Sequence, residues 1–234
     1  MFPIRDDIPS RHAPVMTLLL IALNTAIFLF AAILPRDEVR QLFYLFGIVP
    51  ARFAHPAWAA RVGFPADDYW PFVTSMFLHG GWLHLIGNMW TLWIFGDNVE
   101  DRMGRFRFLV FYFACGIAAG ATHFLTSPSS TVPTVGASGA IAGVMGAYFV
   151  LFPRARIVML LPLFVFPYFF EIPAFLFLAY WFVAQILTGT LALAGAADVG
   201  GVAWWAHGGG FLAGAVLFGL FLRPRERSPA LRES

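Results

Sequence analysis

Six apolar runs follow one another along the chain, separated by stretches that are polar or rich in proline and glycine. A helix needs about 20 predominantly apolar residues to cross a bilayer, and most of the runs approach this length. We therefore predict an all-α polytopic membrane protein with six transmembrane helices. The predicted spans are 15–34, 77–95, 108–126, 138–152, 173–189 and 202–222.

The same pattern divides the chain into three regions. Residues 1–14 form an N-terminal segment of mixed charge, residues 15–222 form the six-helix membrane domain, and residues 223–234 form an arginine-rich tail. The first apolar run is longer than the roughly 7–15 residues of a signal-peptide core. We therefore expect an uncleaved first helix.

Two connections between spans have a character of their own. The loop 35–76, between the first and second spans, is long and mixed in charge. The segment 157–170 is apolar and contains two prolines, yet it is too short to cross a bilayer. We predict that it forms a hairpin at the membrane interface.

Composition and charge agree with a membrane protein. Of the 234 residues, 59% are hydrophobic and 12% are charged, whereas a soluble domain carries about 25% charged residues. The net charge of +2 gives no electrostatic support for a nucleic-acid partner. The single cysteine, Cys115, excludes an intrachain disulfide and a multi-cysteine metal site, and we expect no metal or cofactor.

The arginines indicate how the chain is oriented. If the N-terminus is cytoplasmic, 11 of the 15 arginines lie on the cytoplasmic side, as the positive-inside rule requires. The other four all lie in the loop 35–76, which then becomes a long first external loop. We predict a multi-pass protein of a prokaryotic cell inner membrane with both termini in the cytoplasm.

Ser138 begins the fourth span, which is the shortest of the six. A helix from Ser138 to Phe152 is about 21 Å long, whereas the hydrocarbon core is about 30 Å thick. Pro153 and Arg154 fix the inner end, so Ser138 must lie below the outer surface. Irregular backbone at that depth is tolerated only where it lines a cavity or is buried in protein. The sequence thus predicts a recess open to the outside, with Ser138 at its floor.

Three other polar side chains reach the same depth. His207 lies near the outer end of the sixth span, and His84 and Asn88 lie one helical turn apart in the outer half of the second. Ionisable residues inside a membrane are costly and tend to mark function. Small-xxx-small faces on the fourth and sixth spans allow close helix approach, and they consist of Gly139 and Gly143, and of Gly210 and Gly214.

Taken singly, each of these residues also has a structural interpretation. Ser138 fits an N-cap of the fourth helix, and His207 and Asn88 fit hydrogen bonds between helices. Their conjunction on three helices at one depth favours a site.

A serine hydroxyl becomes nucleophilic when a base, most often histidine, accepts its proton. Attack on a carbonyl builds an oxyanion that needs preplaced donors, and a helix N-terminus supplies free N–H groups. No acidic residue is placed to orient His207. The arrangement therefore predicts a Ser–His dyad.

Three segments within roughly residues 65–222 resemble motifs of the rhomboid family of intramembrane serine proteases, namely "HLIGNM", "GASGAIAG" and "AHGGGFLAG". The resemblance implies that Ser138 is the nucleophile and His207 the general base. It implies oxyanion roles for His84 and Asn88 and a site-shaping role for Gly136. The six spans resemble the prokaryotic form of the family.

A fourth segment, "GDNVEDRMG", is similar to a family element that contains Glu100, to which we assign a structural role. The chain departs from the family at two positions. Pro71 follows Trp70 where many members carry arginine, and Ala142 stands where many carry tyrosine one turn after the serine.

We predict an intramembrane serine endopeptidase that cleaves single-span membrane proteins near the outer face of the bilayer. The main alternative is a non-catalytic rhomboid-like binder, which predicts loss of Ser138 or His207. A channel or transporter predicts inverted repeats, and a zinc peptidase predicts H-E-x-x-H; none of these is in the sequence. The expected partners are transmembrane protein substrates and the lipid bilayer, and no sequence feature indicates an oligomeric state.

Overall fold

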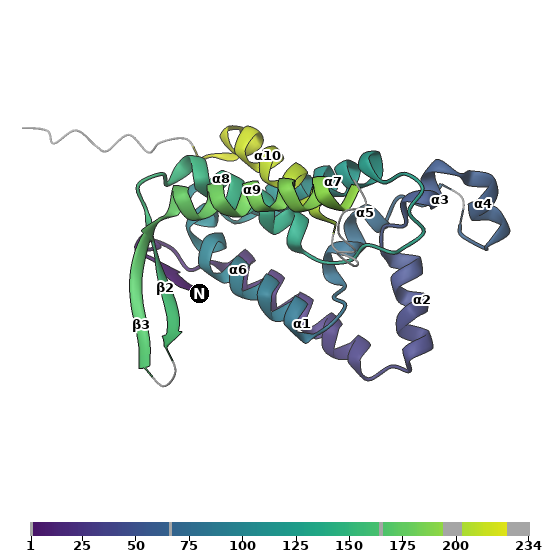
Figure 1. Cartoon of the computed structure of the whole chain (residues 1–234), viewed down its shortest axis with the longest axis horizontal. Helices are drawn as coiled ribbons and strands as arrows, with labels where there is room; N and C mark the ends of the chain where they lie inside the picture. Colours follow the sequence, from purple (N-terminus) through teal and green to yellow (C-terminus); the bar gives the residue numbers. More distant parts are fainter. Residues whose placement is uncertain (1, 66, 164–165, 194–202, 224–234) are drawn as a thin grey trace, which may run out of the picture.

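The computed structural model describes residues 2–65, 67–163, 166–193 and 203–223, and they are mostly helical. Figure 1 shows the long helices gathered in a bundle, with short helices at one end and a β-hairpin at the other. The helices are α1 (Val15–Ala32), α2 (Arg36–Phe46), α3 (Pro50–Ala54), α4 (Pro56–Arg61), α5 (Pro71–Thr74), the 3₁₀ turn η1 (Ser75–Phe77), α6 (Trp82–Met103), α7 (Arg105–Thr126), α8 (Ser138–Leu151), α9 (Ala174–Leu193) and α10 (Trp204–Phe221).

Four of the described helices, α1, α7, α9 and α10, are long and apolar enough to cross a membrane. Each overlaps one of the predicted spans. The predicted fourth span corresponds to α8, whose 14 residues confirm that this helix is short. The second span differs most, because α6 begins at Trp82 and the preceding residues form α5 and η1. Gly80 and Gly81 separate η1 from α6, and consecutive glycines weaken a continuous helix.

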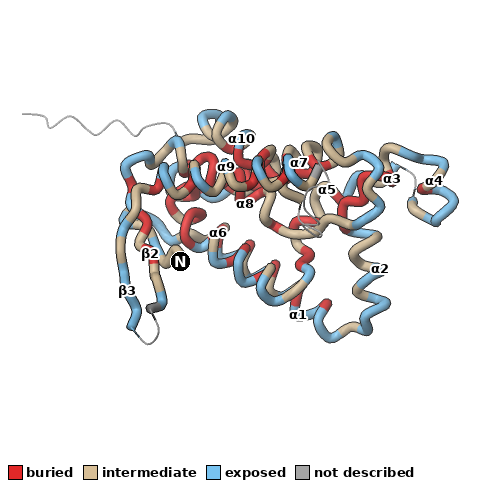
Figure 2. Tube along the Cα trace, in the orientation of Figure 1, coloured by how far each residue is buried: buried red, intermediate tan, exposed pale blue. Residues whose placement is uncertain are grey.

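The centre of the bundle is α8. Residues 140–148 of this helix are all buried, and it packs against α6, α7 and α10. In Figure 2 the buried residues concentrate on α8 and on the helix faces turned toward it, whereas α1 and α9 are largely exposed along their outer sides. Those outer sides carry large apolar residues such as Leu19, Phe30, Leu176 and Leu187, as expected of surfaces in contact with lipid.

The predicted glycine faces bring α8 and α10 into backbone contact. A Cβ atom added to Gly214 would overlap the carbonyl oxygen of Gly143, and one added to Gly210 would overlap that of Gly139. A side chain at either position would therefore push the two helices apart. Small residues of this kind allow close packing in a bilayer, where no hydrophobic force drives helices together.

Glu100, near the end of α6, holds the start of α1. Its carboxylate accepts hydrogen bonds from the backbone N–H groups of Met16 at 3.0 Å and Thr17 at 2.8 Å, and from the Thr17 hydroxyl at 2.9 Å. The first N–H groups of a helix lack partners within the helix, and a negative charge there is stabilising. Glu100 thus has a structural role of the kind predicted.

The expectation of an all-α protein is incomplete, because three segments form an antiparallel sheet of order β1-β2-β3. Strand β1 (Phe2–Asp6) pairs with β2 (Arg156–Leu163), and β2 pairs with β3 (Phe166–Pro173). The hairpin predicted over 157–170 is confirmed, as a β-hairpin at the end of the bundle opposite α2–α4 (Figure 1). A five-residue strand that pairs more than 150 positions away leaves no local signal in the sequence.

Asp6 fastens the end of β1 to the bundle. Its Oδ2 atom accepts hydrogen bonds from the Tyr148 hydroxyl at 2.5 Å and from Asn98 Nδ2 at 2.7 Å. Burial raises the pKa of the Asp6 carboxyl to about 6, and the hydrogen bond from Tyr148 acts in the opposite direction. One carboxyl group therefore links the first strand to both α6 and α8.

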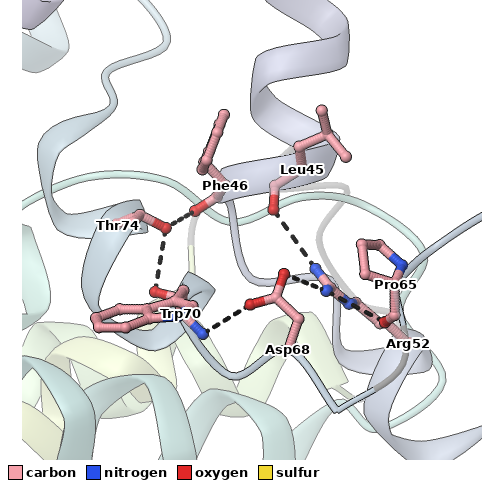
Figure 3. Close-up of polar contacts among 7 residues, drawn as sticks. All are labelled: Leu45, Phe46, Arg52, Pro65, Asp68, Trp70 and Thr74. Carbon is pink, nitrogen blue, oxygen red and sulfur yellow. Dashed lines mark hydrogen bonds and ion pairs between the residues drawn. The ribbon is translucent and has the colours of Figure 1, made fainter.

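Arg52 of α3 organises the first loop (Figure 3). Its side chain is 2% exposed, and its Nη2 atom lies 2.6 Å from Asp68 Oδ2. The guanidinium also lies over the rings of Phe53 and Phe64, at 5.5 and 5.2 Å from their centroids. The other Asp68 oxygen accepts the backbone N–H of Trp70 at 3.1 Å. An arginine from earlier in the chain thus anchors the loop segment where many family members carry arginine after the tryptophan.

The glycine contact leads to a stability prediction. Gly214→Ala should destabilise the protein by roughly 1–3 kcal/mol, because the new methyl group overpacks the α8–α10 contact. Gly219→Ala is the matched control on the same helix, since a Cβ atom there meets nothing within 4 Å. Thermal unfolding in detergent should show a lower midpoint for Gly214→Ala and an unchanged midpoint for Gly219→Ala. Equal behaviour of the two variants would contradict close packing at Gly214.

The Arg52 contacts lead to a prediction about the first loop. Arg52→Ala should make the loop more susceptible to chymotrypsin, because Asp68 and the carbonyl groups of Leu45 and Pro65 lose their common donor. Arg52→Lys should give an intermediate result, since a lysine keeps the charge but not the forked geometry. Arg61→Ala, at an exposed position in the same loop, should leave the digestion rate unchanged. A digestion rate for Arg52→Ala equal to that of wild type contradicts this anchoring.

Candidate active site

Ser138 is the first residue of α8, so its side chain lies beside the N-terminal end of that helix. The segment that leads to it is fixed by a hydrogen bond from the Gly136 N–H to the Ser75 carbonyl at 2.9 Å. The first N–H groups of a helix have no partners within the helix. Ser138 is therefore next to backbone donors that are free to bind an anionic oxygen.

Gly136 occupies a position that admits no side chain. Its φ angle is +131°, a conformation that residues with a Cβ atom rarely adopt. A Cβ atom there would also lie 2.7 Å from His84 Nε2. The glycine thus lets the chain turn into α8 while the His84 ring stays close to the backbone before Ser138.

His207 lies in the first turn of α10 and faces Ser138. The His207 Nε2 and Ser138 Oγ atoms are 2.7 Å apart, which is hydrogen-bond distance for a hydroxyl and an imidazole. The two side chains come from α10 and α8, whose separation is set by the glycine contacts described above. The structure thus brings together the two residues that the sequence assigned to a dyad.

His84 and Asn88 approach the same place from α6. The Gly80 N–H donates to His84 Nδ1 at 3.4 Å. In a neutral imidazole that accepts at Nδ1, the proton is on Nε2, and Nε2 is the atom that lies against Gly136. Asn88 is 8% exposed, and its Nδ2 atom has no hydrogen-bond partner among the described residues. Both residues thus offer an N–H donor that has no other use.

One cavity joins these groups. It has a volume of about 790 Å³ and is lined by residues of α6, α7, α8 and α10. Ser138, His207, His84, Asn88 and Gly136 all contribute to its wall. Much of the remaining lining is glycine and alanine, which leaves room for an extended chain beside the serine.

Gln185 of α9 is a site residue that the sequence analysis missed. Its Oε1 atom lies 2.7 Å from His207 Nδ1, on the side of the ring opposite Ser138. The one available signal was a carboxamide inside an otherwise apolar span, which is a costly placement in a membrane. A carboxamide oxygen can accept a hydrogen bond from an imidazole N–H as a carboxylate does, so Gln185 fills the place where an acidic residue was expected and absent.

Aromatic rings also flank His207. The ring of Trp181, on α9, has its centroid 6.0 Å from that of His207, and Trp204 lies at 6.2 Å. Ala142, which stands where many family members carry tyrosine, is buried in α8. Here the aromatic neighbours of the histidine come from other positions in the chain.

None of the remaining histidines is hydrogen-bonded to Ser138 among the described residues, although His123 lines the same cavity. His123 Nε2 is 2.8 Å from the Thr134 hydroxyl, His55 lies beside Ser129, and His12 pairs with Asp101. His79 is buried with its ring 5.1 Å from that of His84. His12, His55 and His123 thus have side-chain partners of their own, whereas neither ring nitrogen of His79 has a hydrogen-bond partner among the described residues.

The arrangement suits acyl transfer. A hydroxyl within 2.7 Å of an imidazole nitrogen can lose its proton as it attacks a carbonyl carbon. Donors from His84, Asn88 and the start of α8 can stabilise the oxyanion that forms. Such chemistry needs only a substrate carbonyl and water.

Comparison with known proteins agrees with this geometry. The Rhomboid domain family model matches residues 66–224, which include every residue of the cluster. Rhomboid protease GluP of Bacillus subtilis is 42% identical over 80 residues, which make up 34% of this chain and 15% of that protein. Rhomboid-like protein 11, chloroplastic, of Arabidopsis thaliana is 41% identical over 80 residues, or 34% of this chain and 28% of that protein.

Rhomboid protein 1, mitochondrial, of Saccharomyces cerevisiae is 38% identical over 100 residues, or 41% of this chain and 28% of that protein. In each of these three relatives the aligned part is less than a third of the protein's own length. The similarity to these three relatives therefore concerns a part of each protein and not its whole length.

Proposed function

Because the chain belongs to the rhomboid family, we propose that it is an intramembrane serine endopeptidase that cleaves single-span membrane proteins near the outer face of the bilayer. The observation that carries the proposal is the 2.7 Å separation of Ser138 Oγ and His207 Nε2 at the wall of a cavity inside the helix bundle. A non-catalytic relative has no need of this pair.

In the proposed reaction, Ser138 Oγ attacks the carbonyl carbon of the scissile peptide bond and its proton passes to His207 Nε2. The carbonyl oxygen becomes an oxyanion that accepts hydrogen bonds from His84 Nε2, Asn88 Nδ2 and the N–H groups at the start of α8. The intermediate collapses, the C–N bond breaks, and the imidazolium gives its proton to the leaving amine. An ester between Ser138 and the new carboxyl end of the substrate remains.

Water completes the cycle. His207 accepts a proton from a water molecule as that molecule attacks the ester carbonyl, and the imidazolium then returns the proton to Ser138 Oγ as the ester bond breaks. The carboxylic acid product is released, and the free serine hydroxyl is regenerated. The cavity supports this step, since the polar side chains in its wall, among them Ser138, His207 and Asn88, can hydrogen-bond water inside an apolar bundle.

The proposal includes the arrangement in the membrane. We assign the six spans to α1, α6, α7, α8, α9 and α10, with both termini in the cytoplasm of a prokaryotic cell and the loop 35–76 outside. The distribution of arginine supports this orientation. It sets the start of α8, and with it Ser138, toward the outer face, where a substrate helix must unwind to expose a peptide bond.

The third prediction concerns the dyad. Ser138→Ala and His207→Ala should each lower cleavage of a single-span test substrate by at least about a thousandfold, because serine and histidine act as a unit. Purified protein should be incubated with the substrate and the cut located by mass. Ser138→Ala should keep the thermal midpoint of the wild type. His207→Ala should lower the midpoint, because it leaves the buried carboxamide of Gln185 without its partner, so its rate is compared per folded molecule.

A fluorophosphonate probe provides an independent readout of the same pair. It should label the wild-type protein at Ser138 alone. Ser75→Ala is the matched control, because it removes another hydroxyl-bearing residue from the cavity wall, and labelling should persist. Cleavage by Ser138→Ala at the wild-type rate would falsify the proposed function, and wild-type protein that binds the substrate without cutting it would favour the binder.

The fourth prediction concerns the oxyanion donors. Asn88→Ala should lower kcat by up to about a hundredfold with a smaller effect on KM, because its hydrogen bond strengthens in the transition state. The double variant with His84→Ala should lose more, since two donors are then absent. Steady-state kinetics on one substrate measure both effects. A kcat for Asn88→Ala equal to that of wild type would show that Asn88 is not an oxyanion donor.

A further inference from the structure

We propose that Gln185 is the positioning residue for His207, holding the imidazole in the tautomer and orientation that a general base requires. Gln185 touches neither the serine nor the cavity wall and acts only through the histidine. The effect of Gln185 on catalysis rests on the proposed function, because it presupposes that His207 acts as the general base for Ser138.

The tautomer follows from the chemistry of the two partners. A carboxamide oxygen can only accept a hydrogen bond, so His207 Nδ1, 2.7 Å from Gln185 Oε1, must carry a proton. In the neutral ring Nε2 is then unprotonated, and its lone pair faces Ser138 Oγ at 2.7 Å. The serine hydroxyl becomes the donor in that bond, which is the arrangement needed for proton transfer away from the serine.

The opposite tautomer would prevent His207 from acting as a general base. With the proton on Nε2, the ring would donate to Ser138 Oγ and could not accept the serine proton. The carbonyl of Gln185 would then face the bare lone pair of Nδ1, which is repulsive. One hydrogen bond on the far side of the ring therefore selects the productive form, as the aspartate of a serine-protease triad does.

The placement of Gln185 supports a dedicated role. The residue is 8% exposed on a helix that is otherwise almost wholly apolar. Among the described residues, its bond to His207 is the only side-chain hydrogen bond from α9 to another element. Thr188 and Thr190 donate to carbonyl groups of their own helix. An unpaired carboxamide in this position would be costly, and its partner is the proposed base.

An amide differs from a carboxylate in one respect that matters for the rate. Gln185 fixes the proton on Nδ1, but it adds no negative charge to stabilise the imidazolium that forms after proton transfer. Its contribution is therefore mainly one of tautomer and orientation. The arrangement is a triad in geometry with a neutral third member.

The experiment compares three variants of the full-length protein in detergent. Gln185→Leu removes the acceptor and keeps a similar volume, and Gln185→Glu keeps an acceptor oxygen. Thr188→Val is the matched control, because it removes a polar group of α9 that does not contact the histidine. The measurements are kcat and KM on one test substrate, the rate of fluorophosphonate labelling at Ser138, and the thermal midpoint.

We expect Gln185→Leu to lower kcat and the labelling rate by roughly tenfold, the effect of one lost neutral hydrogen bond. KM should change little, since substrate does not contact Gln185. Gln185→Glu should recover most of the rate, and Thr188→Val should match the wild type. A Gln185→Leu enzyme with wild-type kcat overturns the proposal. So does a variant that loses thermal stability while its kcat per folded molecule is unchanged, because Gln185 would then only join helices.

Nitrogen NMR of ¹⁵N-histidine-labelled protein tests the positioning without any reaction. The His207 signals, identified by their absence in His207→Ala, should show a proton on Nδ1 and none on Nε2. Gln185→Leu should lose this preference. If the wild type neither cuts substrate nor reacts with the probe, the proposed function fails, while the Nδ1 proton and its loss in Gln185→Leu still report whether Gln185 positions the ring. A His207 that carries its proton on Nε2 in the wild type overturns the positioning role.

Discussion

Close contact between the backbones of α8 and α10 fixes the distance on which the site depends. The carbonyl oxygens of Gly139 and Gly143 lie where any side chain on Gly210 or Gly214 would have to go. Ser138 and His207 sit at the ends of these two helices and inherit their separation. A bilayer gives two apolar helices no hydrophobic reason to associate, so shape at the interface carries much of the energy of association. The small residues that permit packing are thus also what sets the geometry of the polar pair.

Two polar side chains inside the bundle are paired with groups from a different helix. Glu100 of α6 is satisfied by the start of α1, and Gln185 of α9 is satisfied by His207 of α10. Each pair ties two elements together and removes the cost of an unpaired polar group in an apolar setting. Asn88 Nδ2 is one of several buried polar atoms that have no partner among the described residues, and it belongs to a residue that lines the cavity. A donor held in this way is available at no further cost of reorganisation when a negative charge appears.

The sequence predicted the parts of this architecture that depend on local pattern. Apolar runs located the long helices, and the short run that begins at Ser138 correctly indicated a short helix. Residue types and spacing singled out Ser138 and His207, which lie within hydrogen-bond distance. Both ends of α6 were misplaced, because the predicted span 77–95 began at Phe77, which belongs to η1, and stopped where the polar residues 96–103 begin, although the helix continues through them to Met103.

Features that depend on distant partners were beyond the reach of periodicity. Strand β1 is a strand only because β2 is there to pair with it. Gln185 is recognisable as a partner of His207 only when α9 and α10 lie side by side. Arg52 anchors the first loop by contacting Asp68, which lies 16 residues later in the chain. In each case the residue type was visible, but its partner was fixed by tertiary structure.

The pairing of β1 with β2 has a consequence for the order in which the protein is assembled. Residues 2–6 leave the ribosome early, whereas their partners lie at 157–160. At translation rates of 5–20 residues per second, the first strand waits on the order of 10–30 s for its partner. During that time α1, α6, α7 and α8 are synthesised, so the sheet can close only around helices that already exist. Strand β1 can therefore pair only late, after the helices between the two strands have been synthesised.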